Sequence, residues 1–480
     1  MKVLKNYLYN LTFQLLLIIL PIITTPYISR VLKVDGVGKY SVAYAVCNYF
    51  VLFGMLGFSS YGSREIAYVR DNDDERIRTF WEINNVKFTT MGLSSFVYFI
   101  YVIFFVQQDL KALYFVQVFT LFSSLADISW YFSGMENFKK TATRNIFVKV
   151  ISVILIFAFV KSKEDLVLYA LIIAGSTFCG QVVLWKDIDV KKEFSWKKSR
   201  PGKTLYHLKR TMGLWFPALA INVFTYLDKI MLGYISGDTQ VGLYESSDKI
   251  NRMAIIAVTA FATVMVPKMS NLFAKQDLNE FNRLIDKSLS FVLVLSIPMT
   301  FGIIGISQTV VPWFLGEGYE PTSNLLLISS WLAIALGLSS VFGNQVLISL
   351  NSEKKYTIAV STAAIIDISL NIILIPKFNA YGAILASVIA NYVCMLMMMF
   401  YARKYFSTRA FVKKLAFYSI VSAVMGLLVW MIGIPLQPTI ITTALQIVVG
   451  GLFYVCVLFV FKDENILVVG DLIKKRNNHK

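Results

Sequence analysis

Long apolar runs recur along the whole chain and are separated by short polar stretches. A transmembrane α-helix needs about 20 consecutive, mostly apolar residues, and fourteen runs approach or exceed that length. They cover residues 11–33, 36–62, 84–106, 112–133, 146–161, 166–186, 212–235, 244–269, 288–309, 322–350, 357–376, 381–402, 415–434 and 438–461. No A-x-A-type cleavage site follows the first apolar run, which favours a span over a removed signal peptide. The pattern predicts an all-α polytopic membrane protein with about fourteen transmembrane helices.

Composition agrees with this interpretation and orients the chain. Of its 480 residues, 56% are hydrophobic, and the formal net charge is +17. The basic residues gather in alternate loops, as in the segment 186–210, while the intervening loops are nearly bare. The positive-inside rule accounts for this distribution, so the charge does not indicate a nucleic-acid partner. The rule predicts that the basic loops and both termini lie in the cytoplasm.

Cysteine and histidine do not indicate a metal or redox site. The four cysteines stand singly in apolar runs without a C-x-x-C spacing, which favours packing roles. His207 and His479 fall in segments predicted to be cytoplasmic, so the sequence provides no histidine relay inside the membrane. We expect no metal centre and no bound cofactor.

The two halves of the chain resemble each other. Three pairs of short segments match in order at offsets of 204, 215 and 213 residues: Val37–Tyr40 with Val241–Tyr244, Lys139–Lys140 with Lys354–Lys355, and Ala170–Ala174 with Ala383–Ser387. Blocks with an even number of spans keep the same orientation, so such repeats are parallel and related by an axis along the membrane normal. We predict two six-helix bundles related by a pseudo-two-fold axis, plus two extra C-terminal helices. The expected domains are a first lobe at 1–186, a basic cytoplasmic linker at 187–211, a second lobe at 212–402, and the extra helices with a cytoplasmic tail at 403–480.

Charged residues interrupt two of the apolar runs near the middle of the chain. Asp228 and Lys229 lie within the seventh run, and the eighth run opens with Glu245, Asp248, Lys249 and Arg252. The second set falls at positions i, i+3, i+4 and i+7 and therefore shares one helical face. An ionised group at the centre of a membrane helix costs about 2.5–3.5 kcal/mol and usually faces a partner or a cavity. These charges either pair with one another or line a polar interior. The first copy of the repeat has neutral residues at the corresponding positions.

A family resemblance is carried by seven segments: Pro26–Leu32, Gly36–Tyr40, Tyr61–Glu65, Asp228–Gly233, Val241–Tyr244, Leu315–Tyr319 and Asn351–Tyr356. With these segments the chain resembles the polysaccharide transporter family, the bacterial O-antigen and capsule repeat-unit flippases of the multidrug/oligosaccharidyl-lipid/polysaccharide exporter superfamily. The resemblance covers essentially the whole chain. It implies two lobes around a central cavity in the bacterial cytoplasmic membrane. It also implies export of undecaprenyl-pyrophosphate-linked oligosaccharide by alternating access with H⁺ or Na⁺ coupling, no enzymatic activity, and as partners membrane lipids, the polymerase and the chain-length regulator of the pathway.

Such a cargo needs cations for its pyrophosphate and polar or aromatic groups for its sugars. The candidate cations are Arg30, Lys229, Lys249 and Arg252. The candidates for ion coupling are Asp228, Glu245 and Asp248, followed by Asp127 and Asp367. The candidate sugar contacts are Tyr44, Asn48, Asn222, Tyr226, Asn344, Gln345 and Asn371. Each role has a structural alternative: ion pairing for the charges, capping for Asp127 and Asp367, and interhelical hydrogen bonds for the amides.

Three other functions stay open on the sequence alone. A drug exporter of the same superfamily is expected to lack the last two spans. A peptidoglycan-precursor (lipid II) flippase is expected to carry several basic residues in its first span, where this chain offers Arg30. A membrane-embedded polysaccharide polymerase needs long outer loops with catalytic residues, and the outer loops here are short.

Overall fold

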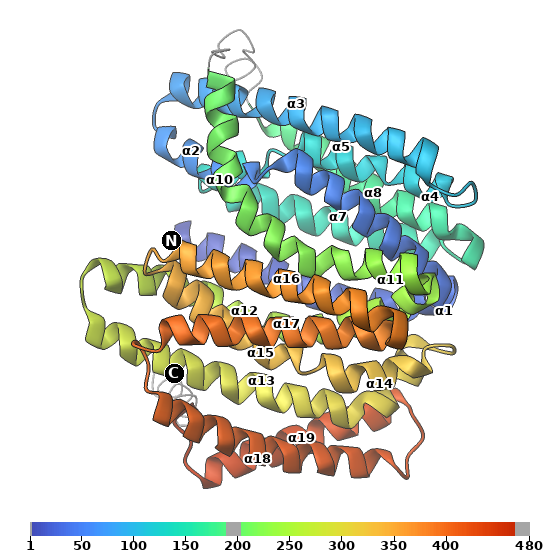
Figure 1. Ribbon diagram of the computed structural model, residues 1–480, viewed down its shortest axis with the longest axis vertical. Coiled ribbons are helices and arrows are strands. Elements are labelled where there is room, and N and C mark those ends of the chain that lie inside the picture. The colour runs from blue at the N-terminus through green and yellow to red at the C-terminus, as the bar shows by residue number, and fades with distance from the viewer. Residues whose placement is uncertain (1, 189–202, 466–480) are drawn as a thin grey trace. The chain divides into compact units, whose positions relative to one another are not determined.

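The computed structural model describes residues 2–188 and 203–465 (Figure 1). Throughout these ranges the regular structure is helical, and they contain no β-strand. Eleven of the described helical segments are long and apolar enough to cross a membrane. One of them, Ile19–Val69, joins two of the apolar runs. The expected all-α membrane fold is confirmed, and the larger number of expected spans is compatible with it.

The chain divides into two compact units, Met1–Gly242 and Leu243–Lys480. The boundary falls inside helix α12 (Asp238–Ala274). The linker expected at 187–211 includes residues 189–202, which lie outside the described residues. The expected division into lobes, linker and extra helices stays a prediction.

The first unit begins with two apolar runs joined in one helical element, α1 (Lys2–Met55). Lys33 interrupts it with φ 59° and ψ 176°, where the first expected span ends. Pro21 and Pro26 lie inside the first half, and proline there removes backbone hydrogen bonds and favours bending. The unit continues with α2 (Phe58–Val69), α3 (Asp73–Phe105), α4 (Lys111–Val116), α5 (Val118–Ala126), α6 (Ser129–Gly134), α7 (Phe138–Phe159), η1 (Lys163–Asp165), α8 (Leu166–Leu184), η2 (Trp185–Asp187), α10 (Thr204–Asn222), η5 (Val223–Leu227) and α11 (Asp228–Ser236).

Buried aromatic side chains hold α2, α3 and α6 together. The ring of Phe80 lies 5.6 Å from that of Trp130 and 5.0 Å from that of Tyr131, measured between centroids. Gly62 of α2 permits this packing, because a Cβ there would lie 2.5 Å from the Trp130 ring. Helix α10 packs against both α2 and α3, as Figure 1 also shows. Helix α10 is therefore attached to two of the helices that these aromatic side chains hold together.

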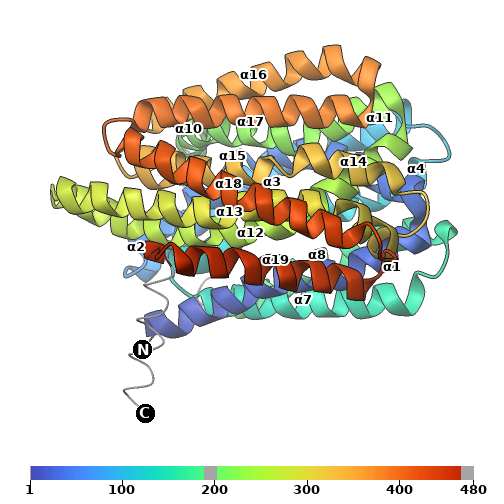
Figure 2. The same cartoon turned by 90° about the horizontal axis from the view of Figure 1, so that it is seen from below.

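The second unit consists of α12 from Leu243 onward and the elements that follow. These are α13 (Leu278–Leu315), α14 (Glu320–Ser329), α15 (Leu332–Ser339), η6 (Ser340–Ile348), α16 (Glu353–Phe378), α17 (Ala380–Ala402), α18 (Thr408–Gly433) and α19 (Ile440–Val460). Helices α16 and α17 pair closely, and α18 and α19 both pack on α13 (Figures 1 and 2). Small residues allow this approach, since a Cβ on Gly305 of α13 would lie 2.9 Å from the backbone oxygen of Gly426 of α18. The last two helices are thus joined to this unit through α13.

Candidate functional site

The charged residues of α12 share one face of the helix, as their spacing predicts. Lys249 Nζ lies 3.6 Å from Glu245 Oε1, and the two residues are one turn apart. Arg252 Nε lies 2.8 Å from Asp248 Oδ2 in the same arrangement, which stabilises helices. Arg252 keeps 53% of its side-chain surface exposed, whereas Asp248 keeps 16%. This face of α12 therefore carries two ion pairs within the helix, and the guanidinium of Arg252 stays accessible.

Asp228 lies where a helix changes its winding. Asn222 ends α10, Tyr226 belongs to η5, and Asp228 begins α11. Element η5 is a π-helix, whose wider turn is frequent at functional sites. Asp228 is fully buried, and Lys229 beside it is partly buried. Burying an ionisable group at such a place is costly, so this segment qualifies as a candidate site.

Tyrosines from α1 and η5 form a continuous aromatic row. Tyr40 and Tyr44 stack with their ring centroids 5.8 Å apart. Tyr226 meets Tyr44 edge-on at 6.3 Å and Tyr49 at 6.4 Å, within the range of favourable aromatic pairs. Asn48 lies on the same helix and donates its Nδ2 to the backbone oxygen of Tyr44. The structure thus brings Tyr44 and Tyr226 together and adds two tyrosines that the sequence does not single out.

The second unit buries polar candidates on α16 and on the π-helix η6. Asp367 and Asn371 lie one turn apart on α16 and have no exposed surface. Gln345 is fully buried on η6, which packs against α16, and its side-chain amide has no hydrogen-bond partner among the described residues. Asn344 beside it is partly exposed. A buried amide without a partner is costly, which makes Gln345 a candidate contact for a polar ligand.

Asp127 and Arg30 have local contacts that suit structural roles. Asp127 follows α5, and its Oδ1 accepts a hydrogen bond of 2.8 Å from the backbone N–H of Ser129 at the start of α6. The backbone oxygen of Asp127 accepts a 2.5 Å hydrogen bond from Nζ of Lys87, a fully buried lysine. Arg30 is exposed on α1 and donates its Nη1 to the backbone oxygen of Pro26. These contacts favour the capping role of Asp127, while the cationic role of Arg30 stays a prediction.

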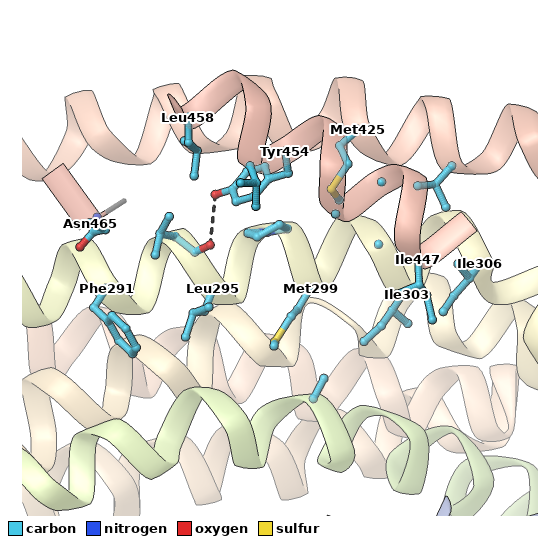
Figure 3. A pocket seen from close by; sticks show the side chains of 18 of the residues that line it. Phe291, Leu295, Met299, Ile303, Ile306, Met425, Ile447, Tyr454, Leu458 and Asn465 are labelled. Atoms are coloured by element: carbon cyan, nitrogen blue, oxygen red, sulfur yellow. Dashed lines mark hydrogen bonds between the residues drawn. The ribbon is translucent and has the colours of Figure 1, made fainter. Parts of the chain in front are cut away.

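An apolar groove of about 830 Å³ runs between α13, α18 and α19 in the second unit (Figure 3). Its lining includes Phe291, Leu295, Met299, Ile303 and Ile306 of α13, Met425 of α18, and Ile447, Tyr454 and Leu458 of α19. Tyr454 donates its hydroxyl to the backbone oxygen of Val294 at 3.1 Å and so ties α19 to α13. Sequence reasoning missed the groove because its lining consists of ordinary apolar residues from three separate helices.

Polar side chains gather at one end of this groove. Asn465 Nδ2 donates to Ser290 Oγ at 2.9 Å. Lys414 Nζ lies 3.1 Å from Glu464 Oε2, and Lys287 joins the lining. The groove is therefore apolar along its length and charged at one end. Such an arrangement can accept a lipid-like molecule.

The fold and these sites define the class of the protein: a polytopic helical membrane protein of the transporter type, with buried charges and an apolar groove. Its residues 3–273 match the family of polysaccharide biosynthesis proteins, and the chain belongs to this family. This confirms the resemblance seen in the sequence.

Relatives and solved structures agree with this assignment. A protein of Escherichia coli (strain K12) that is named as a proposed O-antigen transporter is 22% identical over 387 residues, covering 79% of this chain and 91% of the relative. The lipid II flippase MurJ of Bacillus subtilis (strain 168) is 26% identical over 266 residues, covering 50% of this chain and 49% of the relative. A structure of lipid II flippase MurJ in an inward closed conformation superposes with a TM-score of 0.78 at 16% identity, covering 96% of this chain and 100% of that chain. That likeness shows a shared fold.

Proposed function

We propose that the protein flips undecaprenyl-pyrophosphate-linked oligosaccharide repeat units across the cytoplasmic membrane, for assembly of a capsule, an O-antigen or an exopolysaccharide. The observation that carries this proposal is the groove between α13, α18 and α19, which is apolar along its length and has Lys287 and Glu464 at one end. Relatives named for O-antigen transport and for lipid II flipping support it. The protein acts by alternating access and is not an enzyme.

The polar head of this cargo needs partners on its way across the membrane. A polar group moved into hydrocarbon without a hydrogen bond costs roughly 2–7 kcal/mol. Lys229, Lys249 and Arg252 supply positive charge for the pyrophosphate, and arginine can hold phosphate oxygens with two parallel hydrogen bonds. Tyr44 and Tyr226 offer ring faces to the sugars. We therefore assign head-group contacts to each unit by itself: Tyr44, Tyr226 and Lys229 in the first unit, and Lys249 and Arg252 in the second.

The apolar tail of the cargo fits the groove for a different reason. Lipid tails are as apolar as the groove, so the hydrophobic effect does not drive the tail out of the bilayer into the protein. Close packing along Leu295, Met299 and Ile303 instead fixes where the tail lies. The groove therefore guides the tail while the head group crosses.

Coupling to H⁺ or Na⁺ is assigned to buried carboxylates. Asp228 and Asp367 have no exposed surface, and a buried carboxylate gains a favourable state by taking up a cation. Glu245 and Asp248 already have Lys249 and Arg252 beside them. The two carboxylate side chains also keep 13% and 16% of their surface exposed, so Asp228 and Asp367, which are more deeply buried, are the stronger candidates.

Topology and partners follow from the same proposal. The concentration of basic residues in alternate loops, which lie on one side of the membrane, supports a cytoplasmic position for both termini. A flippase that delivers repeat units to the outer face works beside the polymerase and the chain-length regulator that use them. Both associations are proposals that co-purification can test.

A lipid II flippase is the second candidate, favoured by the match to MurJ of Bacillus subtilis. The two functions share a pyrophosphate-linked cargo and differ in the sugars. Depletion of the protein separates them, because the lipid-linked glycan that accumulates on the inner face identifies the cargo by mass spectrometry. Accumulation of lipid II would replace the O-antigen or capsule assignment.

A substitution that fills the groove between α13, α18 and α19 tests whether the groove is needed for export. Met299→Trp places a larger side chain in the groove, and Ile420→Trp places the same ring on α18 at a position that is 66% exposed. We expect Met299→Trp to reduce surface polysaccharide and to accumulate lipid-linked precursor at normal membrane levels of the protein, while Ile420→Trp exports normally. Normal export by Met299→Trp contradicts the role of the groove.

A further inference from the structure

The two charged residues that line the groove between α13, α18 and α19 lie at the same end of it. Lys287 is exposed near the start of α13, and Glu464 follows the C-terminal end of α19. None of the other described residues in the lining is charged. The positive-inside rule places this end on the cytoplasmic side, because basic residues gather in the segments before α13 and before α18. The groove is therefore charged only where it meets the head groups of the cytoplasmic leaflet.

Hydrogen bonds hold the segment that carries Glu464 in place. The Tyr418 hydroxyl of α18 donates to Asp463 Oδ2 at 2.7 Å. On the other side of Glu464, Asn465 Nδ2 donates to Ser290 Oγ of α13 at 2.9 Å. Both neighbours of Glu464 are thus tied to helices that form the groove, and the position of its carboxylate relative to the groove is fixed.

Lys287 and Glu464 offer one positive and one negative group to the same ligand. Oε2 of Glu464 lies 3.1 Å from Nζ of Lys414, and the Glu464 side chain keeps 81% of its surface exposed. A carboxylate has about four acceptor sites, so this contact leaves Glu464 able to bind a second cation. A pyrophosphate carries several negative charges and is repelled by the Glu464 carboxylate. A head group with one phosphate and one ammonium fits both charges.

The length of the groove exceeds the reach of a phospholipid from one leaflet. Lys287 and Ile306 mark the two ends of the lining on α13, and at 1.5 Å per residue they are about 28 Å apart. The hydrocarbon core is about 30 Å thick, so the acyl chains of one leaflet extend through about half of it. In Figure 3, Phe291 lies toward one end of the groove and Ile306 toward the other. A phospholipid of the cytoplasmic leaflet therefore passes Phe291 and Leu295 and ends before Ile306.

We propose that the cytoplasmic half of the groove binds a zwitterionic phospholipid with an ammonium head group, of the phosphatidylethanolamine type. Lipid tails are as apolar as the groove, so the charged contacts of the head group determine which lipid binds. The phosphate lies at Lys287, the ammonium lies at Glu464, and one acyl chain packs along Phe291 and Leu295. This lipid leaves the groove when the tail of the cargo enters, a consequence that rests on the proposed function.

Binding of two phospholipids to the full-length protein tests the ammonium contact. Phosphatidylethanolamine and phosphatidylglycerol with identical acyl chains are titrated separately into the protein in detergent, and the bound lipid is measured by native mass spectrometry. We expect phosphatidylethanolamine to bind about two- to fivefold more tightly, the effect of one exposed ion pair. Glu464→Gln should remove this preference, while Glu280→Gln, which changes a residue of α13 outside the groove lining, should keep it. The ratio of the two affinities within one variant does not depend on how much of the protein is folded.

The same titrations test the phosphate contact. Lys287→Gln should weaken the binding of both lipids by a similar factor, because both carry a phosphate. Arg283→Gln removes a cation one turn earlier on α13, outside the groove lining, and should change neither affinity. Equal affinity of the native protein for the two lipids, or a preference that persists in Glu464→Gln, overturns the proposal.

Tryptophan substitutions test which half of the groove holds the phospholipid. Leu295→Trp fills the cytoplasmic half and should lose most of the phosphatidylethanolamine binding, whereas Ile306→Trp fills the opposite end and should keep it. Binding of native strength in Leu295→Trp contradicts the assigned position. None of these measurements contains cargo, so they do not depend on the proposed function. Undecaprenyl phosphate should displace the bound phosphatidylethanolamine, and a failure of displacement beside intact phospholipid binding counts against the proposed function alone.

Discussion

Gly38 and Gly242 pack against each other's helices in a reciprocal way. A Cβ on Gly38 would lie 1.8 Å from the backbone oxygen of Asp238, which is four residues before Gly242. A Cβ on Gly242 would lie 2.1 Å from the backbone oxygen of Val34, which is four residues before Gly38. The two copies of the repeated Val-Gly-x-Tyr sequence therefore meet at their glycines.

Substitution of either glycine should destabilise the protein. Gly38→Ala and Gly242→Ala each force a backbone to move, and over-packing of this kind costs about 1–3 kcal/mol. We expect a lower midpoint of thermal unfolding in detergent for both variants. Gly92→Ala is the control, because a Cβ at Gly92 has no atom within 4 Å. An unchanged midpoint of thermal unfolding in Gly38→Ala would show that α1 and α12 can move apart at little cost in free energy.

Variants of Arg252 test whether this residue binds the cargo or only forms an ion pair within α12. The Arg252 side chain is half exposed, and an ion pair between residues one helical turn apart contributes about 0.3–0.5 kcal/mol, so the loss of the pair with Asp248 should cost about that much stability. We expect Arg252→Gln to lose export at normal protein levels, and Asp248→Asn/Arg252→Gln to remain inactive. Surface polysaccharide is the readout. Arg283→Gln breaks a comparable pair with Glu280 on α13 and should export normally. Recovery of export in the double variant would mean that the pair is only structural.

Variants of Asp367 test whether its carboxylate binds the coupling ion. Asp367→Asn keeps the size of the side chain and removes its charge, so export should no longer respond to an imposed H⁺ or Na⁺ gradient. Flipping of a fluorescent lipid-linked glycan in proteoliposomes measures this response. Asp228→Asn should behave in the same way, whereas Glu317→Gln in an exposed loop should not. A gradient response of native size in both aspartate variants rules out these carboxylates as the coupling site.

Variants of Tyr226 test whether its ring contacts the sugars of the cargo. A stacked ring contributes about 0.5–1.5 kcal/mol beyond its buried area. Tyr226→Phe retains the ring and should export normally, while Tyr226→Ala should reduce the initial rate of flipping between about twofold and tenfold. Tyr68→Ala removes a tyrosine that is 75% exposed on α2 and is the matched control. Equal rates for Tyr226→Ala and Tyr68→Ala would remove Tyr226 from the proposed cargo path.

Those features of the candidate site that depend on residues close together in the sequence could be predicted. The pairing of Glu245 with Lys249 and of Asp248 with Arg252 follows from a spacing of four residues, because such positions face each other on any α-helix. The end of the first span at Lys33 follows from the apolar pattern in the same way. The π-helical winding before Asp228 has no such local signal.

The sequence by itself determined the membrane class, the helical fold and the positions of the charged residues, because hydrocarbon requires apolar runs of fixed length and tolerates few charges. The tertiary structure alone decided which distant residues meet. Tyr61 and His207 are 146 positions apart in the chain, and the groove takes its lining from α13, α18 and α19. An apolar run shows that a helix is buried in lipid or protein, but the choice of neighbour depends on how side chains of several helices fit together. That fit encloses His207 and forms the groove from ordinary apolar residues.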